Sequence, residues 1–194
     1  MKLDSKKYNR ILGIAPSSRG FGYALLEKEK LANWGSSSAS KDKNTKCAMR
    51  VEELILHFEP EVMVLEDTGA EGSRRHQRIR ELSQRLFALG VSHVIPVAWF
   101  SREQVMQFFF RNGKGTKQEV AQHIGEQFPD YLEMMVPPKR RTWMNEDYRM
   151  DIFDAVALAF MFREAICTGR TKVQNGSALD PARAGDGPRL DWGT

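Results

Sequence analysis

Two acidic residues in the last third of the sequence are spaced so that their carboxylates could act together. Asp151 and Asp154 lie at the start of a predicted helix over residues 151–166, and their i, i+3 spacing puts both on one face. That face continues with Leu158 and Phe162, so both carboxylates lie on its apolar side. A carboxylate there is costly unless it is paired or binds a cation, and hard cations such as Mg²⁺ prefer oxygen ligands. The alternative is two acids that only favour the positive end of the helix dipole.

A second pair of acidic residues, Glu66 and Asp67, ends the apolar run EVMVLED at residues 61–67. A short continuous apolar run of this kind is typical of a strand buried on both faces of a central parallel sheet. Carboxylates at the end of such a strand could serve as metal ligands. Taken alone, they also fit an ordinary strand exit.

The stretch ILGIAPSSRGFGYALLE, residues 11–27, has the form of a hairpin whose first strand ends at a small polar turn. Strands of this kind often end in an acidic residue, but Ala15 occupies that place and alanine cannot ligate a metal. Strand alternation puts Ala15 on the same face as Gly13. The turn therefore resembles the edge of a metal site that lacks one carboxylate.

Basic residues gather in two short segments. Residues 74–85, RRHQRIRELSQR, contain five arginines and one glutamate, and Lys139, Arg140 and Arg141 follow two prolines. The net charge of +4 is mild, so this clustering indicates an anionic partner more strongly than the total charge does. A solvated helix face is the alternative for each arginine taken singly.

Hydrophobic periodicity and turn residues predict the elements that must position these groups. Strands are expected over residues 10–15, 21–28, 30–37, 61–67 and 93–100, and helices over residues 45–59, 74–89, 102–110, 117–128 and 151–166. Ser73 is the predicted N-cap of the 74–89 helix and Gly90 its stop, while Ser101 and Thr116 begin capping boxes. This order predicts an α/β fold, a mixed sheet with the antiparallel hairpin first and helices on both faces.

Length and composition fit one folded domain over residues 1–167. The chain has 194 residues, of which 41% are hydrophobic and 28% charged. From Thr168 onward no apolar period is present, so residues 168–194 are expected to be a disordered tail. No apolar run approaches the roughly 20 residues that span a bilayer. The polar first residues are not expected to form a signal peptide. Two cysteines are too few for a disulfide framework. These features favour a cytoplasmic protein that does not associate with membranes.

Four segments, in order across residues 10–166, resemble the RuvC-type Holliday junction resolvases, a branch of the RNase H-like superfamily. ILGIAPSSRGFGYALLE resembles the family's first hairpin, usually I-G-I-D-P-G-x-x-x-x-G, and EVMVLED resembles the strand that ends in the second acidic ligand. GKGTKQEVAQHI, residues 113–124, resembles a Gly-Lys segment that leads into a helix beside the DNA. DIFDAVALAF, residues 151–160, resembles the final D-x-x-D-A-x-A-x-A helix. The first and last matches are the most specific.

The resemblance implies a metal-dependent endonuclease that hydrolyses phosphodiesters at Holliday (four-way) junctions or other branched DNA. Its fold would be an RNase H-like mixed five-stranded sheet. Two Mg²⁺ or Mn²⁺ ions would be held by Glu66, Asp151 and Asp154, with Asp67 as a further candidate ligand. Lys117 would lie beside the scissile strand and offset phosphate charge, and a solvated lysine is the alternative for it.

The resemblance also implies a double-stranded, branched DNA partner and a homodimer, since resolvases of this kind cut two strands symmetrically. The candidate DNA-binding residues are basic side chains from three segments: Arg74, Arg75, Arg78, Arg85, Lys114, Lys117, Lys139, Arg140 and Arg141. The apolar stripe of the 74–89 helix would supply the dimer interface, provided that the core does not use it.

The sequence departs from the family pattern at Ala15, where the family has its first aspartate. Either alanine is an inactivating substitution in a nuclease, or the natural protein has alanine and binds DNA without cutting, or it uses a shifted ligand such as Asp67, Glu146 or Asp147. Activity is therefore expected to be disabled or attenuated. The alternative function is a non-catalytic module that binds branched DNA or another protein.

Overall fold

The computed structural model describes residues 8–70, 75–141, 143 and 145–167 of the 194-residue chain. Arg74, Ser73 and the expected tail over residues 168–194 lie outside the described residues.

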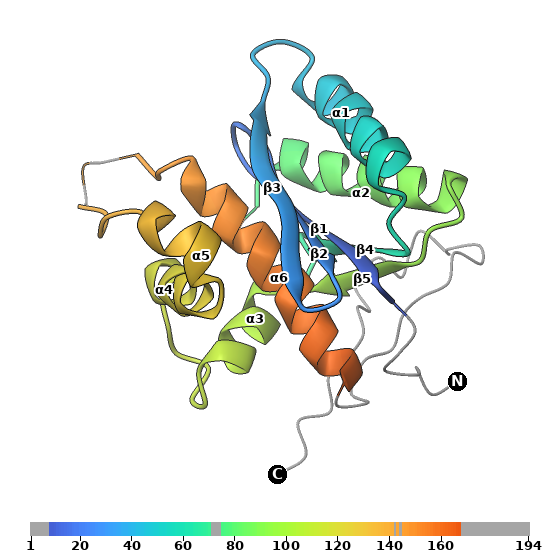
Figure 1. Ribbon diagram of the computed structural model, residues 1–194. Coiled ribbons are helices and arrows are strands. Elements are labelled where there is room, and N and C mark those ends of the chain that lie inside the picture. The colour runs from blue at the N-terminus through green and yellow to red at the C-terminus, as the bar shows by residue number, and fades with distance from the viewer. Residues whose placement is uncertain (1–7, 71–74, 142, 144, 168–194) are drawn as a thin grey trace.

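A five-stranded mixed sheet forms the centre of the fold, with the spatial order β3-β2-β1-β4-β5 (Figure 1). The strands are β1 (Arg10–Pro16), β2 (Gly20–Glu27), β3 (Lys30–Ser38), β4 (Val62–Glu66) and β5 (Val97–Phe100). β2 runs antiparallel to both of its neighbours, β1 and β3, whereas β1, β4 and β5 run parallel. The predicted mixed sheet with a leading hairpin is therefore confirmed.

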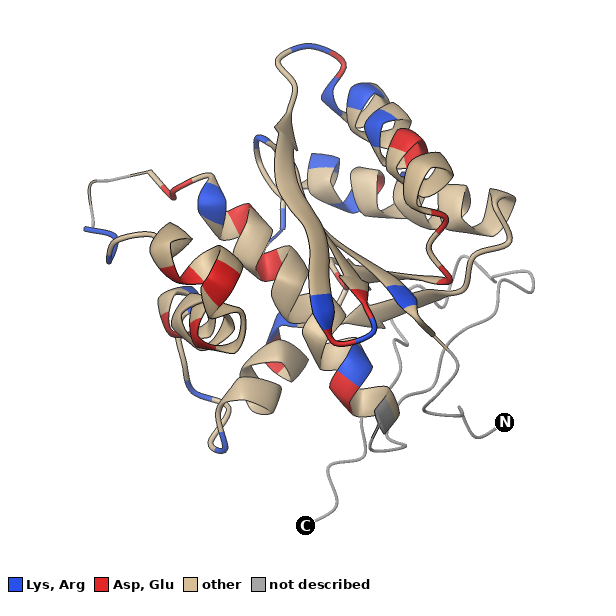
Figure 2. Cartoon of the chain, viewed as in Figure 1, with Lys and Arg blue, Asp and Glu red and all other residues tan. Residues whose placement is uncertain are grey.

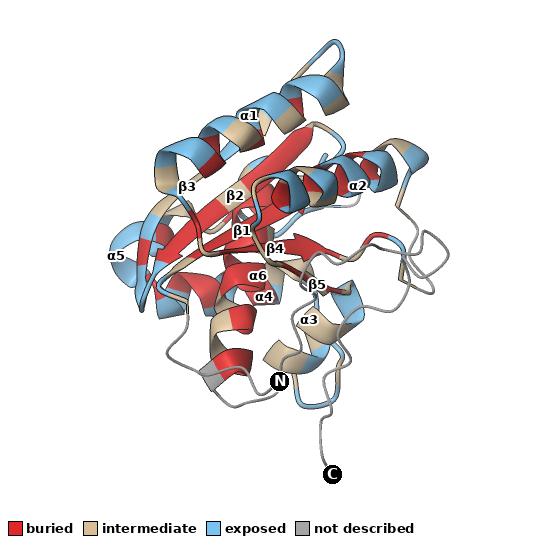
Figure 3. Ribbon diagram, turned by 90° about the vertical axis from the view of Figure 1, so that its right-hand side faces the viewer, coloured by how far each residue is buried: buried red, intermediate tan, exposed pale blue. Residues whose placement is uncertain are grey.

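Helices cover both faces of the sheet (Figure 1), and in Figure 3, turned by 90°, one helical layer lies in front of the buried strands. One face carries α1 (Lys43–Phe58) and α2 (Gln77–Ser92). The other face carries α6 (Arg149–Cys167), against which α3 (Arg102–Phe109) and α4 (Lys117–Gln127) pack. Two short elements follow α4, namely α5 (Pro129–Leu132) and the 3₁₀ turn η1 (Glu133–Met135), and neither is predicted from the sequence.

Strand alternation divides the buried apolar residues into two clusters. Leu12 and Ile14 of β1 pack with α1 and α2, whereas Ile11 and Ala15 of the same strand pack beneath α6. Because both faces are covered, β1 and β4 read as continuous apolar runs in the sequence.

The predicted boundaries of the second helix are wrong at both ends. His76 is the N-cap of α2, so the helix begins at Gln77 rather than directly after Ser73. The helix also continues through Gly90 to Ser92. A Cβ atom at Gly90 would contact side chains of Val97 and Met63, so this glycine permits close packing on the sheet rather than ending the helix.

The remaining boundaries agree more closely with the predictions. Both predicted capping boxes are present, at Ser101 before α3 and at Thr116 before α4. The expected 93–100 strand is shorter, because His93 caps α2 and Val94 has a positive φ of 56°. No helix among the described residues is long and apolar enough to cross a membrane.

Candidate active site

Ala15 and Glu66 are neighbours at the ends of two parallel strands. β1 pairs with β4 in a register that matches Ile14 with Leu65, and one further step along both strands sets Ala15 beside Glu66. Ala15 belongs to the core cluster beneath α6, and Glu66 lines a cavity together with α6 residues. Ala15 is only 2% exposed. The position predicted for a missing carboxylate therefore lies directly beside the second acidic residue.

Two glycines let α6 lie close to the hairpin, and this contact positions both aspartates. A Cβ atom at Gly22 would clash with the backbone carbonyl of Asp151, and one at Gly13 would clash with the carbonyl of Ala155. Gly22 pairs with Ala15 across the hairpin. No pattern in the sequence indicates a packing role for these glycines, although their place opposite the aspartate-bearing helix is the reason that the acidic residues converge.

Glu66 forms a two-pronged ion pair with Arg75, which lies just before α2. The guanidinium Nε donates to Glu66 Oε1 at 3.0 Å, and Nη2 donates to Oε1 at 2.7 Å and to Oε2 at 2.5 Å. Burial raises the pKa of Glu66, and Arg75 opposes that shift without cancelling it. Because Arg75 engages both carboxylate oxygens, Glu66 is held by an internal cation.

Asp154 is paired with Lys117, the first residue of α4. Lys117 Nζ donates to Asp154 Oδ2 at 2.5 Å and lies 3.1 Å from Glu146 Oε1. Burial acts to lower the pKa of Lys117, but Asp154 and Glu146 outweigh it and raise the pKa. The capping box at Thr116 fixes the start of α4 and thus the place of this lysine.

Asp151 is the most deeply buried acid of the group, with 4% of its surface exposed. Arg19, in the turn of the first hairpin, places its Nη2 3.8 Å from Asp151 Oδ2 and donates from Nη1 to the backbone oxygen of Glu146. Burial raises the pKa of Asp151, while a hydrogen bond from Ser17 and the charge of Arg19 act in the opposite direction. Each predicted ligand therefore has a basic neighbour from another segment.

The predicted ligands do not fit a pair of divalent cations in this arrangement. Glu66 and Asp154 share a small cavity of about 30 Å³, and Asp151 is not part of its lining. Arg75 and Lys117 engage the carboxylates that would ligate a metal, and Ala15 offers a methyl group where the family has an oxygen. Within the described part of the chain, no three His, Cys, Asp or Glu side chains form a group that could hold a metal ion.

Of the three shifted ligands considered from the sequence, Glu146 pairs with Lys117 in the site, whereas Asp67 and Asp147 are engaged elsewhere. Asp67 accepts a hydrogen bond from the backbone N–H of Gly69 and so closes the turn after β4, and burial raises its pKa. Asp147 pairs with Arg149, whose hydrogen bonds lower the pKa of Asp147. Neither lines the small cavity.

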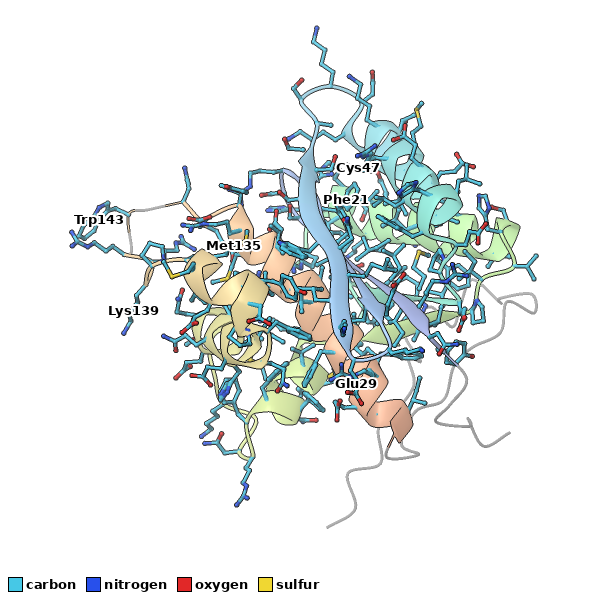
Figure 4. All side chains as sticks on the ribbon, in the orientation of Figure 1. Phe21, Glu29, Cys47, Met135, Lys139 and Trp143 are labelled. Carbon is cyan, nitrogen blue, oxygen red and sulfur yellow. The ribbon has the colours of Figure 1, made fainter. Side chains whose placement is uncertain are left out.

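An open groove of about 550 Å³ continues outward from the acidic residues. Its lining combines five basic side chains with two acidic ones: Arg75, Arg102, Lys117, Lys139 and Arg140, against Glu146 and Asp147. Figure 4 shows Lys139 and Trp143 projecting outward at the end of the molecule beyond α5. Trp143 is 77% exposed, and the Arg141 guanidinium lies 5.6 Å from its ring centre. The excess of basic side chains favours an anionic ligand.

The other predicted DNA-binding residues divide into two groups. Arg78 donates to the backbone oxygens of Ser17 and Ser18, so this arginine braces the first turn from within the protein. Arg85 and Lys114 are exposed but lie outside the groove lining. Arg102, which lines both the cavity and the groove, is absent from the predicted set. Its place at the start of α3, directly after the Ser101 cap, is the sequence signal that could have indicated it.

The core uses most of the apolar stripe of α2, the predicted dimer interface. Ile79, Leu82 and Leu86 are at most 3% exposed, and Leu82 and Leu86 pack in the core cluster beneath α1 and α2. Leu89 is half-buried against the same cluster. The stripe therefore leaves little apolar surface for a partner, and the homodimer stays a prediction.

The sheet order and the acidic end of α6 define an RNase H-like nuclease fold. Thermus thermophilus RuvC shares this fold with a TM-score of 0.62 and 18% identity, covering 82% of this chain and 96% of that protein. The yeast mitochondrial Holliday junction resolvase has a TM-score of 0.58 and 16% identity, covering 83% of this chain and 80% of its own. At such identities the likeness shows the fold, and it confirms the predicted fold class.

Sequence similarity identifies the family more narrowly. The crossover junction endodeoxyribonuclease RuvC of Geotalea uraniireducens is 32% identical over 127 residues, covering 59% of this chain and 73% of the relative. The enzyme of the same name from Geobacter metallireducens is 26% identical over 125 residues, covering 59% of this chain and 76% of the relative. No protein-family model matches the chain. The chain belongs to the RuvC family of crossover junction endodeoxyribonucleases, which are metal-dependent in general.

Proposed function

We propose that this chain acts on four-way junctions or other branched DNA, held along the basic groove, and that its phosphodiester cleavage is disabled or attenuated. One observation carries the proposal that cleavage is disabled or attenuated: Ala15 lies buried beside Glu66, and Glu66 is already engaged by Arg75. The proposed branched-DNA substrate is supported by family membership and by a solved complex of Thermus thermophilus RuvC with a Holliday junction substrate.

The groove would hold DNA through its backbone. Basic side chains neutralise phosphate charge and fix the position of a duplex, but they do not read bases. Lys117 and Arg75 line the inner end of the groove, whereas Lys139 and Arg140 line its outer part. DNA affinity is therefore expected to depend on DNA shape and on salt more than on sequence.

Mg²⁺ or Mn²⁺ are the ions that a complete carboxylate site of this kind would take, because hard cations prefer carboxylate oxygens. A pair of such ions would require an oxygen ligand at position 15 and a Glu66 that is not bound by Arg75. We therefore assign no metal-dependent step to the chain as it stands.

The second candidate function is a non-catalytic module that binds branched DNA. The charge pairs within the acidic pocket favour it, since they stabilise the pocket in the absence of any ligand. A homodimer and a cytoplasmic location are also part of the proposal. The homodimer rests on the symmetry of junction cleavage and on the prevalence of two-fold dimers. Light scattering with and without DNA tests the homodimer.

A junction-cleavage and binding assay separates these functions. A labelled four-way junction and a linear duplex of the same length are incubated with the protein in Mg²⁺ or Mn²⁺, and binding is measured over a salt series. Cleavage of the junction supports the attenuated nuclease, tight binding without cleavage supports the module, and equal affinity for both DNAs contradicts the proposal.

The salt series also tests the groove. Changing Arg102, Lys139 and Arg140 to alanine is expected to flatten the slope of log K against log salt by about 0.9 per lost phosphate contact. A matched control changes Lys30 and Lys46 to alanine, because both are exposed and lie outside the groove. An unchanged slope in the groove variant would remove the groove from the binding surface.

A further inference from the structure

Two basic side chains occupy the centre of the acidic pocket. Arg75 reaches Glu66 from the segment before α2, and Lys117 reaches Asp154 from the start of α4. Both also line the groove. The chain thus places cations of its own between the carboxylates and the surface on which a phosphate would arrive.

We infer that Arg75 and Lys117 take the place of divalent cations in this chain and form, with Arg102, a metal-independent docking site for a DNA phosphodiester. This inference rests on the proposed function for the identity of the ligand. Its chemical claim, that the pocket excludes divalent ions, is independent of DNA.

The charge balance of the pocket supports this inference. The charged residues that line the small cavity are Glu66 and Asp154 on the negative side, and Arg75, Arg102 and Lys117 on the positive side. Carboxylates alone would repel a phosphodiester, which carries one negative charge, until a metal ion bound. With three cations against two anions, the lining has a net charge of +1 without any metal.

The donor geometry of the two cations supports the same conclusion. Arg75 engages both oxygens of Glu66, so a metal ion could bind this carboxylate only by displacing the guanidinium. Lys117 donates to Asp154, forms an ion pair with Glu146 and lines the groove as well. An ammonium is a compact donor with rotatable N–H groups, which suits contact with a phosphate oxygen.

This arrangement changes what is needed to regain a metal site. An aspartate at position 15 would supply the absent oxygen, but Glu66 would still be engaged by Arg75. We therefore expect Ala15→Asp alone to bind no Mn²⁺ at this pocket, whereas Ala15→Asp combined with Arg75→Gln binds it. The matched control is Ala15→Asp with Arg102→Gln, which removes the same charge from the same cavity and leaves the Glu66 pair intact.

Mn²⁺ alone is the probe, and calorimetric titration of the purified full-length protein measures its binding. The wild-type protein is expected to show no saturable binding that Asp154→Asn removes. The double variant with Arg75→Gln is expected to gain such binding, and the Arg102→Gln control is not. Saturable wild-type binding that disappears in Asp154→Asn would overturn the inference, as would a folded Arg75→Gln double variant that binds no Mn²⁺.

Loss of Arg75 leaves a buried carboxylate without its partner, so folding of each variant is checked by thermal unfolding. The wild-type protein provides a test that needs no variant: its affinity for a four-way junction should be equal in EDTA and in Mg²⁺ at matched ionic strength. Arg75→Gln should weaken that affinity about tenfold or more, as expected for one charge-assisted contact. Junction binding that requires Mg²⁺ contradicts the inference, whereas no junction binding in either condition contradicts the proposed function and leaves the Mn²⁺ result standing.

Discussion

The two faces of the central sheet are built from the same strands but are stabilised differently. On the face that α1 and α2 cover, the buried cluster consists of hydrophobic side chains such as Leu12, Leu65 and Leu86. On the face that α6 covers, Glu66 and Asp151 are buried among apolar residues and are held by basic side chains from distant segments. Figure 2 shows acidic positions in the N-terminal half of α6, which packs on the β1–β2 hairpin.

The difference shows how a functional surface is supported. The apolar face gains stability from burial alone, which is non-directional and roughly proportional to area. The charged face depends on specific pairs, in which loss of one partner exposes the full cost of burying the other. The first face should therefore respond to volume, and the second to charge balance.

The largest expected effect comes from breaking one pair on the charged face. Arg75→Met should lower the free energy of unfolding by about 3–5 kcal/mol, because Glu66 then lies buried without a partner. Glu66→Met together with Arg75→Met should recover most of that loss. Urea unfolding of both single variants and the double variant measures the coupling, and simple additivity of the two losses would contradict the assignment of a buried ion pair.

A change of volume on the apolar face should be nearly as costly but should have no charge partner to rescue it. Leu86 is fully buried in α2, and Leu86→Ala is expected to cost about 2–5 kcal/mol. Val91→Ala, at the exposed end of the same helix, is the control and should change stability by about 0.5 kcal/mol or less. Equal losses in the two variants would show that α2 does not form the core of this face.

The pH dependence of stability should distinguish the faces as well. The pKa of Lys117 is raised in the folded protein, so its contribution is fully present below the ordinary lysine pKa of 10.5 and is lost as pH rises through the folded value. The difference in unfolding free energy between wild type and Lys117→Met should therefore be constant below pH 10.5 and shrink above it. A difference that grows with alkaline pH would refute the pairing of Lys117 with the carboxylates.

The two capping boxes offer a smaller and more local comparison. Thr116→Ala and Ser101→Ala should each cost about 1 kcal/mol, because each leaves one N-terminal N–H without its side-chain acceptor. Both variants should also weaken junction binding, since Lys117 is the first residue of α4 and Arg102 is the first residue of α3. Unchanged DNA affinity in Thr116→Ala would mean that the start of α4 does not position Lys117 for DNA.

The smallest effect is expected from removing the segment after Gly169. Its sequence has no apolar period with which to offset the cost of ordering. Truncation should leave the melting temperature within a few degrees of that of the full chain, as measured by calorimetry. A larger drop would assign this segment a stabilising contact with one of the two faces.

The sequence was sufficient to predict what depends on local pattern. The hairpin, the run that forms β4, the two capping boxes and the aspartate-bearing helix follow from periodicity and cap chemistry, and each is present. The C-terminal end of α2 differs from the prediction because Gly90 resembles a helix stop, while its use in packing on the sheet is a tertiary feature.

The ion pairs of the pocket could not be predicted from the sequence pattern. The arginine-rich segment predicts that Arg75 faces DNA, but it gives no sign that Arg75 also binds Glu66, nine residues earlier. Lys117 and Asp154 are separated by 37 positions, and only the packing of α4 on α6 brings them together. Arg78 was assigned to DNA for the same reason as Arg75, and its use as an internal brace depends on the position of the first turn.

The close contact between Gly22 and the carbonyl of Asp151 has a consequence for how this protein could change over evolutionary time. Any side chain at position 22 would push α6 away from the hairpin and so separate Asp151 and Asp154 from Ala15 and Glu66. Ala15, by contrast, lacks a carboxylate without disturbing the backbone around it. An ancestor or descendant could therefore gain or lose the side chains of this pocket through a few point mutations, in either direction, as long as the backbone frame persists. Replacement of Gly22 would be much harder to reverse, because it would also displace the backbone that positions those side chains.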